Sequence, residues 1–231
     1  MAVEKIKNGN RIIGTMVRLT RNPAIAKVAA ASGLDFIMMD MEHGPYSLET
    51  LSDIFKVAKS IGLGGFVRVP ELSKGYVSRV LDVGADGVMV PIIESAKQAE
   101  QLAEWSKYAT IGKRGFGGSG GHTDFIGMGG RAPDFMKEAN SRVLTIAQIE
   151  SKSAVEEIDT IAQVEGIDAL LIGPNDLAIS LGCPGDLTGN QVNEAIEKIV
   201  KTAQKHSKII GMHSGDARLE RWIPQGMSLR M

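Results

Sequence analysis

Three side chains able to do acid–base chemistry follow an apolar run near the start of the chain. Residues 36–39 (FIMM) are followed within four positions by Asp40, Glu42 and His43. A short apolar run of this kind predicts a strand that is buried on both faces. Charges at its carboxyl end cost desolvation energy unless they are used there, and parallel α/β proteins build active sites at that end. His43 is either a general base, its tautomer set by Asp40 or Glu42, or a structural histidine.

Two more carboxylates follow later apolar runs. Glu150 ends the run RVLTIAQIE, and Asp176 lies in the sequence GPND that follows residues 168–172. Carboxylates from neighbouring strands, with positions left for water and substrate, suit a hard divalent ion such as Mg²⁺ or Mn²⁺. The alternative is that each carboxylate caps the helix after it, since GPND is also typical of a turn.

Arg68 lies inside the apolar run FVRVP. Its guanidinium is always charged and requires an anionic partner, so it either forms a structural ion pair or stabilises a developing oxyanion. An imine-forming aldolase needs a lysine buried within a strand, and no predicted strand has one in its interior. This absence favours a metal ion over an imine as the electron sink.

The elements that must position these residues alternate along the chain. Strand-like runs occupy residues 11–19, 36–41, 65–70, 87–94, 142–150, 168–172, 208–213 and 227–231. Helix-like segments occupy residues 23–32, 48–61, 75–83, 95–106, 153–164, 190–206 and 216–223, with a short helix after Pro133. Eight such units without a linker predict one (β/α)8 TIM-barrel domain over residues 1–231, with a doubly wound open sheet as the alternative. In a barrel, the carboxyl ends of all strands meet at one mouth.

The chain ends at the eighth predicted strand, so no eighth helix follows. We expect the outer faces of strands eight and one to be partly bare, covered by a neighbouring chain or by residues of a longer natural protein. A glycine-rich stretch at residues 110–131 lacks helical or strand periodicity, and we interpret it as a mobile flap. It is a weak phosphate-loop candidate because it has no Walker lysine.

Composition narrows the class of partner. The formal net charge is −1 and the charged fraction is 23%, so no long-range field recruits nucleic acid or an anionic membrane. No apolar segment approaches the roughly 20 residues that cross a bilayer, and the N-terminus lacks a signal-peptide core. The single cysteine, Cys183, excludes an internal disulfide. We expect a cytoplasmic enzyme acting on a small molecule.

The ordered motifs resemble one known family along nearly the whole chain. They are DMEHG at 40–44, RVP at 68–70, LDVGA at 81–85, GKRG at 112–115, QIE at 148–150 and IGPNDL at 172–177. The sequence is similar to the HpcH/HpaI aldolase family, the class II pyruvate aldolases of the phosphoenolpyruvate/pyruvate barrel group. The resemblance implies reversible cleavage of a 4-hydroxy-2-oxo acid to pyruvate and an aldehyde through a metal-stabilised enolate. It also implies a homohexamer that uses Mg²⁺, Mn²⁺ or Co²⁺.

The resemblance also implies a role for each matched residue. The metal ligands would be Glu150 and Asp176. The enolate oxygen would be stabilised by Arg68, and the base would be His43, acting through water and oriented by Asp40. A metal-bound water would be held by Glu42. The substrate would be contacted by Gln148 and by Asn175 near the metal, and its pyruvate carboxylate would be bound by the backbone at Gly173 and Pro174. Asp82 would act across a subunit interface.

Three features depart from the family pattern. The sequence Tyr108-Ala109-Thr110 replaces a common Tyr-Pro-Pro, Asn175 replaces a small residue, and the eighth helix is missing. Two rival functions stay open. One is a citrate-lyase-like enzyme acting on an acyl-CoA, although no basic patch for the nucleotide is evident. The other is a barrel that binds a metal and an oxo-acid without turnover, although binding alone requires neither His43 nor Arg68.

Overall fold

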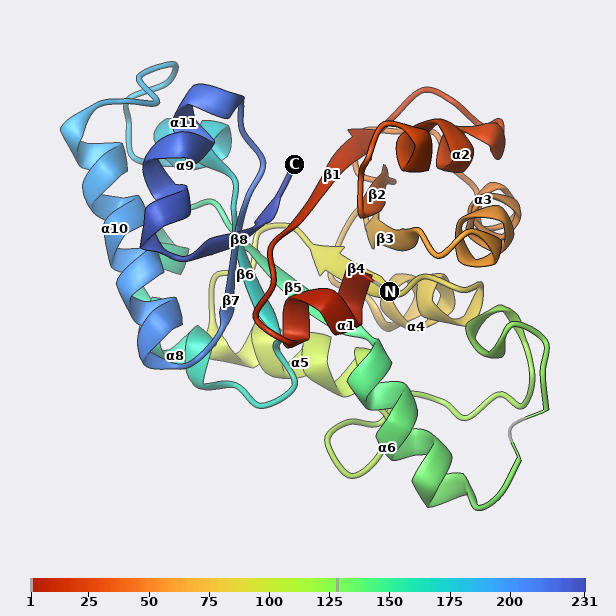
Figure 1. The fold of residues 1–231 in the computed structure, drawn as a ribbon. Helices are drawn as coiled ribbons and strands as arrows, with labels where there is room; N and C mark the ends of the chain where they lie inside the picture. The colour runs from red at the N-terminus through yellow and green to blue at the C-terminus, as the bar shows by residue number, and fades with distance from the viewer. Residues whose placement is uncertain (1, 128) are drawn as a thin grey trace.

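The chain folds into a closed parallel barrel. The computed structural model describes residues 2–127 and 129–231, apart from the side chain of Asp216. Eight strands pair in chain order, and the eighth pairs with the first (Figure 1). The predicted (β/α)8 class is therefore confirmed, and the open-sheet alternative is wrong.

The strands lie close to their predicted positions. They are β1 (Ile12–Val17), β2 (Phe36–Asp40), β3 (Gly64–Arg68), β4 (Gly87–Val90), β5 (Leu144–Ile149), β6 (Ala169–Ile172), β7 (Ile209–Met212) and β8 (Met227–Arg230). The helices are α1 (Ala2–Lys7), α2 (Ala24–Ala31), α3 (Leu48–Ser60), α4 (Lys74–Asp82), α5 (Ala96–Ser106), α6 (Ala132–Arg142), α7 (Lys152–Glu156), α8 (Ile158–Gln163), α9 (Pro174–Ser180), α10 (Asn190–Lys205) and α11 (Asp216–Trp222). Two 3₁₀ turns, η1 (Gly121–Thr123) and η2 (Ile223–Gln225), complete the elements.

Three helical details differ from the sequence-based expectation. The segment 153–164 is two short helices, α7 and α8, rather than one. The sequence GPND begins α9 rather than a simple turn, because Pro174 occupies the first helical position, where its missing N–H costs nothing. Helix α1 was not predicted; it is only six residues long, and its burial of Ala2, Val3 and Ile6 depends on tertiary contacts.

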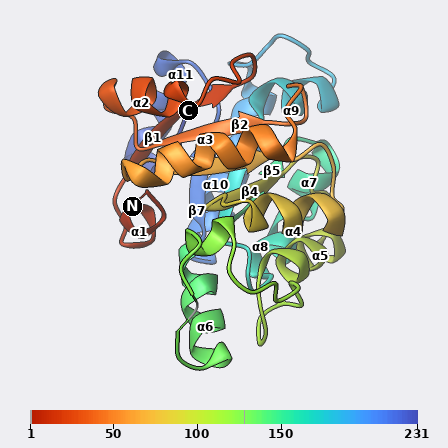
Figure 2. The ribbon, with the colours of Figure 1, turned by 90° about the vertical axis from the view of Figure 1, so that its right-hand side faces the viewer.

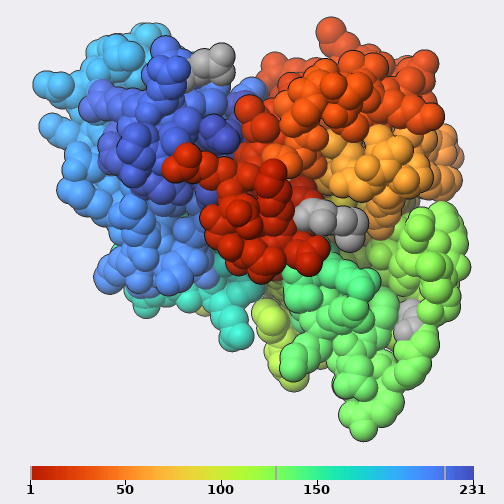
Figure 3. Space-filling view, in the orientation of Figure 1, coloured from red at the N-terminus to blue at the C-terminus, as the bar shows by residue number. Residues whose placement is uncertain are grey.

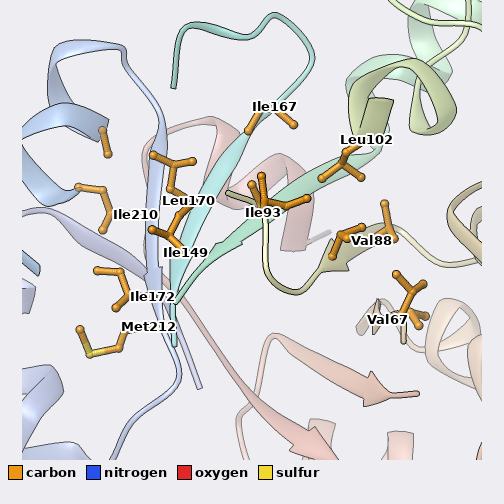
Figure 4. Packing of buried hydrophobic residues seen from close by; sticks show 14 of the residues in the cluster. Val67, Val88, Ile93, Leu102, Ile149, Ile167, Leu170, Ile172, Ile210 and Met212 are labelled. Atoms are coloured by element: carbon orange, nitrogen blue, oxygen red, sulfur yellow. The ribbon is translucent and has the colours of Figure 1, made fainter. Parts of the chain in front are cut away.

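Side chains along each strand alternate between the barrel interior and the surrounding helices. On β2, Phe36 and Met38 belong to an inner cluster that includes residues of α1, whereas Ile37 and Met39 belong to the outer cluster packed under the helices. The outer cluster also contains Leu170, which lies beside other strand residues in Figure 4. The apolar strand runs are thus explained by burial on both faces.

The outer face of β1 is less covered than those of the central strands. In β1, the inner residue Ile12 is buried, while Ile13 and Thr15, which point the other way, are exposed. Only Met231 follows β8 in the sequence. The exposure of these β1 residues agrees with the expectation that the outer face of strand one is partly bare.

The glycine-rich stretch lies at the end of the barrel where the strands begin. Lys59, at the end of α3, donates to the carbonyl of Gly121 at 2.8 Å, and Arg114 pairs with Asp82, the last residue of α4, at 2.6 Å. Together with α6, this stretch projects from the body of the molecule (Figures 2 and 3). Within one chain it is therefore remote from the barrel mouth. No helix in the described part of the chain is long and apolar enough to span a membrane.

An ion pair between a buried lysine and a partly exposed aspartate holds that same end of the barrel together. Lys107 follows α5, its side chain is 2% exposed, and its ammonium lies 2.7 Å from Asp168. It also donates to the backbone carbonyls of Val143 and Asn140. Burial lowers the pKa of Lys107 to about 8. Lys7 of α1 shares the Asp168 carboxylate at 3.1 Å, so one cluster joins α1, α5 and the loops before β5 and β6.

Replacement of Lys107 by Ala should lower the free energy of unfolding by about 3 kcal/mol, because it removes one partner of a buried pair and leaves carbonyls unsatisfied. Urea unfolding measures the change. The matched control is Lys113→Ala, since Lys113 is 77% exposed beside Glu104; there the expected change is below about 0.5 kcal/mol. Equal effects of the two substitutions would contradict a structural role for Lys107.

Candidate active site

Strand register gathers the predicted polar residues inside the barrel mouth. Asp40 pairs directly with Arg68 between β2 and β3. Both continue the inward-facing alternation of Phe36 and Met38 on one strand and of Phe66 on the other. Gln148 continues the inner alternation of β5 in the same way. The inner side chains are therefore apolar at the lower end of the barrel and polar at the mouth.

Asp40 and Arg68 form a fully buried, two-point ion pair. Arg68 donates from Nε to Oδ1 of Asp40 at 2.9 Å and from Nη2 to Oδ2 at 2.7 Å. The exposed fractions of the two side chains are 0% and 5%. Burial acts to raise the pKa of Asp40, but the hydrogen bonds and charge of Arg68 hold that pKa below its ordinary value. Arg68 therefore forms the structural ion pair that was one of the two interpretations of its sequence. A second N–H remains on each of Nη1 and Nη2.

A second arginine at this position was missed by the sequence analysis. Arg18, just after β1, donates from Nε to Oδ2 of Asp40 at 2.9 Å. The register Val17–Met39 already places Arg18 beside Asp40. The available signal was the same as for Arg68, namely an arginine embedded in the apolar run RIIGTMVRL. Three adjacent strands thus present arginine, aspartate and arginine at one level of the mouth.

Glu42 and His43 lie on the outer side of this pair. Oε2 of Glu42 is 2.8 Å from Nη1 of Arg68, and Nε2 of His43 is 3.9 Å from the same carboxylate oxygen. The His43 ring is 55% exposed. Asp40 was expected to orient this ring, but it accepts hydrogen bonds from the backbone N–H groups of Glu42 and His43 instead. The carboxylate within reach of the ring is that of Glu42.

Glu150 is buried at the carboxyl end of β5. One oxygen accepts the backbone N–H of Ile92 at 3.0 Å, and the other accepts the side-chain amide of Gln148. Ile92 adopts a φ of 54°, a strained conformation for a β-branched residue, which fits a backbone constrained to present its N–H. Gly173 is required beside this carboxylate, because a Cβ there would collide with Oε2 of Glu150.

Asp176 lies in the first turn of α9, together with Pro174 and Asn175. Burial, together with the charges of Asp176 and Glu42, raises the pKa of Glu150 to about 7. Three like charges therefore act on one region, and Oε1 of Gln148 is buried there without a hydrogen-bond partner among the described residues. A hard cation bound by Glu150 and Asp176 would relieve this repulsion, so the donor set fits a divalent ion.

The ion would not be enclosed by protein alone. Within residues 2–127 and 129–231, no three His, Cys, Asp or Glu side chains converge in a way that could hold a metal. Two carboxylates leave most coordination positions to water and substrate, as expected for a catalytic Mg²⁺-type site.

A further histidine lies at the mouth, whereas one of the predicted site residues lies at the other end of the barrel. His213 follows β7 at the mouth, where burial and the nearby charges of Arg68 and Arg18 lower the pKa of its imidazole. Asp82 ends α4, five residues before β4 begins, and so lies at the opposite end of the barrel. Any contribution of Asp82 to a mouth must come from a different chain, and this role stays a prediction.

Divalent-ion affinity should rise as the pH rises through 7. Glu150 must be ionised to bind a cation, and its pKa of about 7 makes it mostly protonated at pH 6 and mostly ionised at pH 8. Titration with Mn²⁺ should give about tenfold weaker binding at pH 6 than at pH 8. In Glu42→Gln, one repelling charge is lost, so the midpoint should move to lower pH. An affinity that does not change over this range would contradict ligation by Glu150.

Comparison with known proteins identifies relatives of the chain in sequence and in structure. A family model described as HpcH/HpaI aldolase/citrate lyase matches residues 16–227. The 2-keto-3-deoxy-L-rhamnonate aldolase of Salmonella gallinarum is 32% identical over 213 residues, covering 92% of this chain and 78% of the relative. The HpcH/HpaI aldolase of Desulfitobacterium hafniense DCB-2 superposes with a TM-score of 0.93 at 34% identity, covering 98% of this chain and 87% of the other. Citrate synthase SbnG superposes with a TM-score of 0.88 at 30% identity, covering 99% of this chain and 88% of the other. The chain belongs to the HpcH/HpaI aldolase/citrate lyase family.

Proposed function

We propose that the protein is a metal-dependent aldolase that reversibly cleaves a 4-hydroxy-2-oxo acid to pyruvate and an aldehyde. One observation carries the proposal: a pair of acidic donors, Glu150 and Asp176, shares a mouth with an arginine that Asp40 holds in place and with an accessible imidazole. Relatives named as aldolases support it.

Cleavage involves removal of one proton, the breaking of one carbon–carbon bond and the return of one proton. The C4 hydroxyl of the substrate loses its proton, the C3–C4 bond breaks, and its electron pair remains on the three-carbon fragment as an enolate. His43 takes the hydroxyl proton, directly or through water, with Glu42 as the carboxylate beside its ring. After the aldehyde leaves, a proton returned to C3 gives pyruvate.

Arg68 is suited to the charge that develops on the enolate oxygen. Its fork is fixed by Asp40 and Glu42, so no reorganisation is needed when the charge appears. The remaining N–H groups of Nη1 and Nη2 would donate to that oxygen. Asp40 acts as a positioning residue for Arg68 in this scheme.

Glu150 and Asp176 would hold the cation, with Mg²⁺ or Mn²⁺ as the proposed ions. When bound, the ion supplies Lewis-acid polarisation of the 2-oxo group. Gln148 would contact the substrate, since its buried Oε1 lacks a partner among the described residues. The backbone at Gly173 and Pro174 was expected to bind the pyruvate carboxylate, but the N–H of Gly173 donates to the carbonyl of Ile149 at 3.2 Å and Pro174 has no N–H. We propose that the start of α9, with Asn175 near the ion, binds this carboxylate instead.

The aldolase proposal predicts pyruvate release from a 4-hydroxy-2-oxo acid when Mg²⁺ or Mn²⁺ is present. Removal of the ion with EDTA should abolish release, and added ion should restore it, because the enolate loses its main charge stabilisation. A lactate-dehydrogenase-coupled assay of pyruvate reports the rate. Full activity in EDTA would refute the metal mechanism. Cleavage of a citryl-CoA thioester, without release of pyruvate from any hydroxy-oxo acid, would instead support the acyl-CoA alternative.

Arg68→Lys should lower kcat about 100-fold or more, because an ammonium does not reproduce the two-point geometry with Asp40 and cannot aim further N–H groups at the oxyanion. Steady-state kinetics of pyruvate release measures kcat, and Mn²⁺ affinity serves as the control because Arg68 is not a ligand in this scheme. Near wild-type kcat in the variant would rule out the oxyanion role.

A further inference from the structure

The proton that C3 gains during cleavage has no residue assigned to it. His43 takes the proton of the C4 hydroxyl, and its ring lies beside Glu42, on the outer side of the Asp40–Arg68 pair. In the reverse direction a methyl proton must leave pyruvate, which requires a base that faces the barrel interior. A second imidazole, that of His213, lies at the mouth just after β7.

Strand alternation turns the side chain of His213 into the mouth. On β7, Ile209 packs against the inner apolar cluster, whereas Ile210 and Met212 belong to the outer cluster. Gly211 therefore lies on the inner side, and His213, two positions further on, continues that side. The same alternation directs the polar residues of β2, β3 and β5 into the mouth.

The neighbouring strand brings His213 close to the proposed ion ligands. Strands β6 and β7 are adjacent in the barrel (Figure 1), and Ile172 pairs with Met212. The next residues along each strand are Gly173 and His213, and the N–H of His213 donates to the carbonyl of Ile172 at 3.5 Å. A Cβ on Gly173 would collide with Oε2 of Glu150. A residue without a side chain therefore separates His213 from the buried carboxylate.

The charges of Arg68 and Arg18 also act on the ring of His213. Burial and these two charges lower the pKa of the imidazole, against an opposing effect of Asp40. A neutral imidazole accepts a proton, and the cations beside it favour the return of that proton afterwards. Neither ring nitrogen has a hydrogen-bond partner among residues 2–127 and 129–231, so both can contact a substrate.

We propose that His213 transfers the proton at C3 of the substrate, so that the two proton transfers of the reaction belong to two different histidines. This inference rests on the proposed function. In synthesis, a methyl C–H bond of pyruvate breaks, its electron pair forms the C2–C3 double bond of the enolate, the carbonyl electron pair moves to oxygen, and an N–H bond forms on the ring. In cleavage, the imidazolium returns a proton to C3 and is protonated again from solvent. The proton of the C4 oxygen stays with His43.

Pyruvate alone separates the two transfers, because its methyl protons can exchange without any aldehyde. In D₂O with Mg²⁺, the loss of the methyl signal in ¹H NMR measures the exchange rate. His213→Gln should slow exchange about 100-fold or more, the usual contribution of a general base, whereas His43→Gln should slow cleavage and change exchange by less than about threefold. His206→Gln is the matched control, because His206 binds Asp159 at the end of α10 and should affect neither rate.

Two further measurements separate catalysis from structural support. Calorimetry with Mn²⁺ alone should give the same affinity for His213→Gln as for the wild type, since His213 is not a ligand in this scheme. Added imidazole should restore exchange about tenfold or more in His213→Ala, because a diffusible base can replace the missing ring.

Wild-type exchange rates in both His213 variants would overturn the proposal. So would loss of Mn²⁺ affinity together with exchange, since the substitution would then act through the ion site, and so would loss of exchange in His43→Gln, since one histidine would then serve both transfers. A wild-type protein that neither exchanges pyruvate protons nor cleaves any hydroxy-oxo acid refutes the proposed function instead.

Discussion

The buried ion pair between Asp40 and Arg68 is the interaction on which the mouth of this barrel depends. A buried pair repays its desolvation only when the geometry is good and the remaining hydrogen-bonding groups are satisfied. Here the two-point contact is supplemented by Arg18, by Glu42 and by backbone N–H groups after β2. Loss of either partner would leave a charge inside the barrel, so the arrangement fixes the direction of the Arg68 fork.

The mouth is electrostatically divided. Arg18, after β1, and Arg68, at the end of β3, contact Asp40, whereas Glu150 follows β5 and Asp176 lies in the first turn of α9. The charge of Asp176 acts on Glu150. In the first group the arginines neutralise the charge of Asp40, and the pKa of Asp40 is lowered. In the second group no cation neutralises the carboxylates among the described residues, and the pKa of Glu150 rises to about 7. The pKa values of Asp40 and Glu150 are therefore shifted in opposite directions, because Asp40 has cations beside it, whereas Glu150 is buried near like charges.

The opposite end of the barrel is closed by apolar packing and ion pairs. Helix α1 packs against the inner apolar cluster, and the Lys107–Asp168 pair ties the loops before β5 and β6 to it. Polar groups there bond to backbone carbonyls and to each other. This separation of a stabilising lower end from a chemical upper end is the usual division in TIM barrels. It also explains why the glycine-rich stretch, packed against the ends of α3 and α4, lies far from its own chain's mouth.

The eight repeats, the strand positions and most of the polar residues at the mouth could be predicted from the sequence alone. Apolar runs that end in Asp40, Arg68, Gln148 and Glu150 were legible because strands buried on both faces have few polar residues, so each exception stands out. It could not determine who pairs with whom. Asp40 meets the backbone of His43 rather than its ring, Arg18 joins the site from β1, and GPND begins a helix. These outcomes depend on strand register and barrel closure, which bring residues from distant segments to one level. A local sequence pattern does not specify which distant residues are brought together.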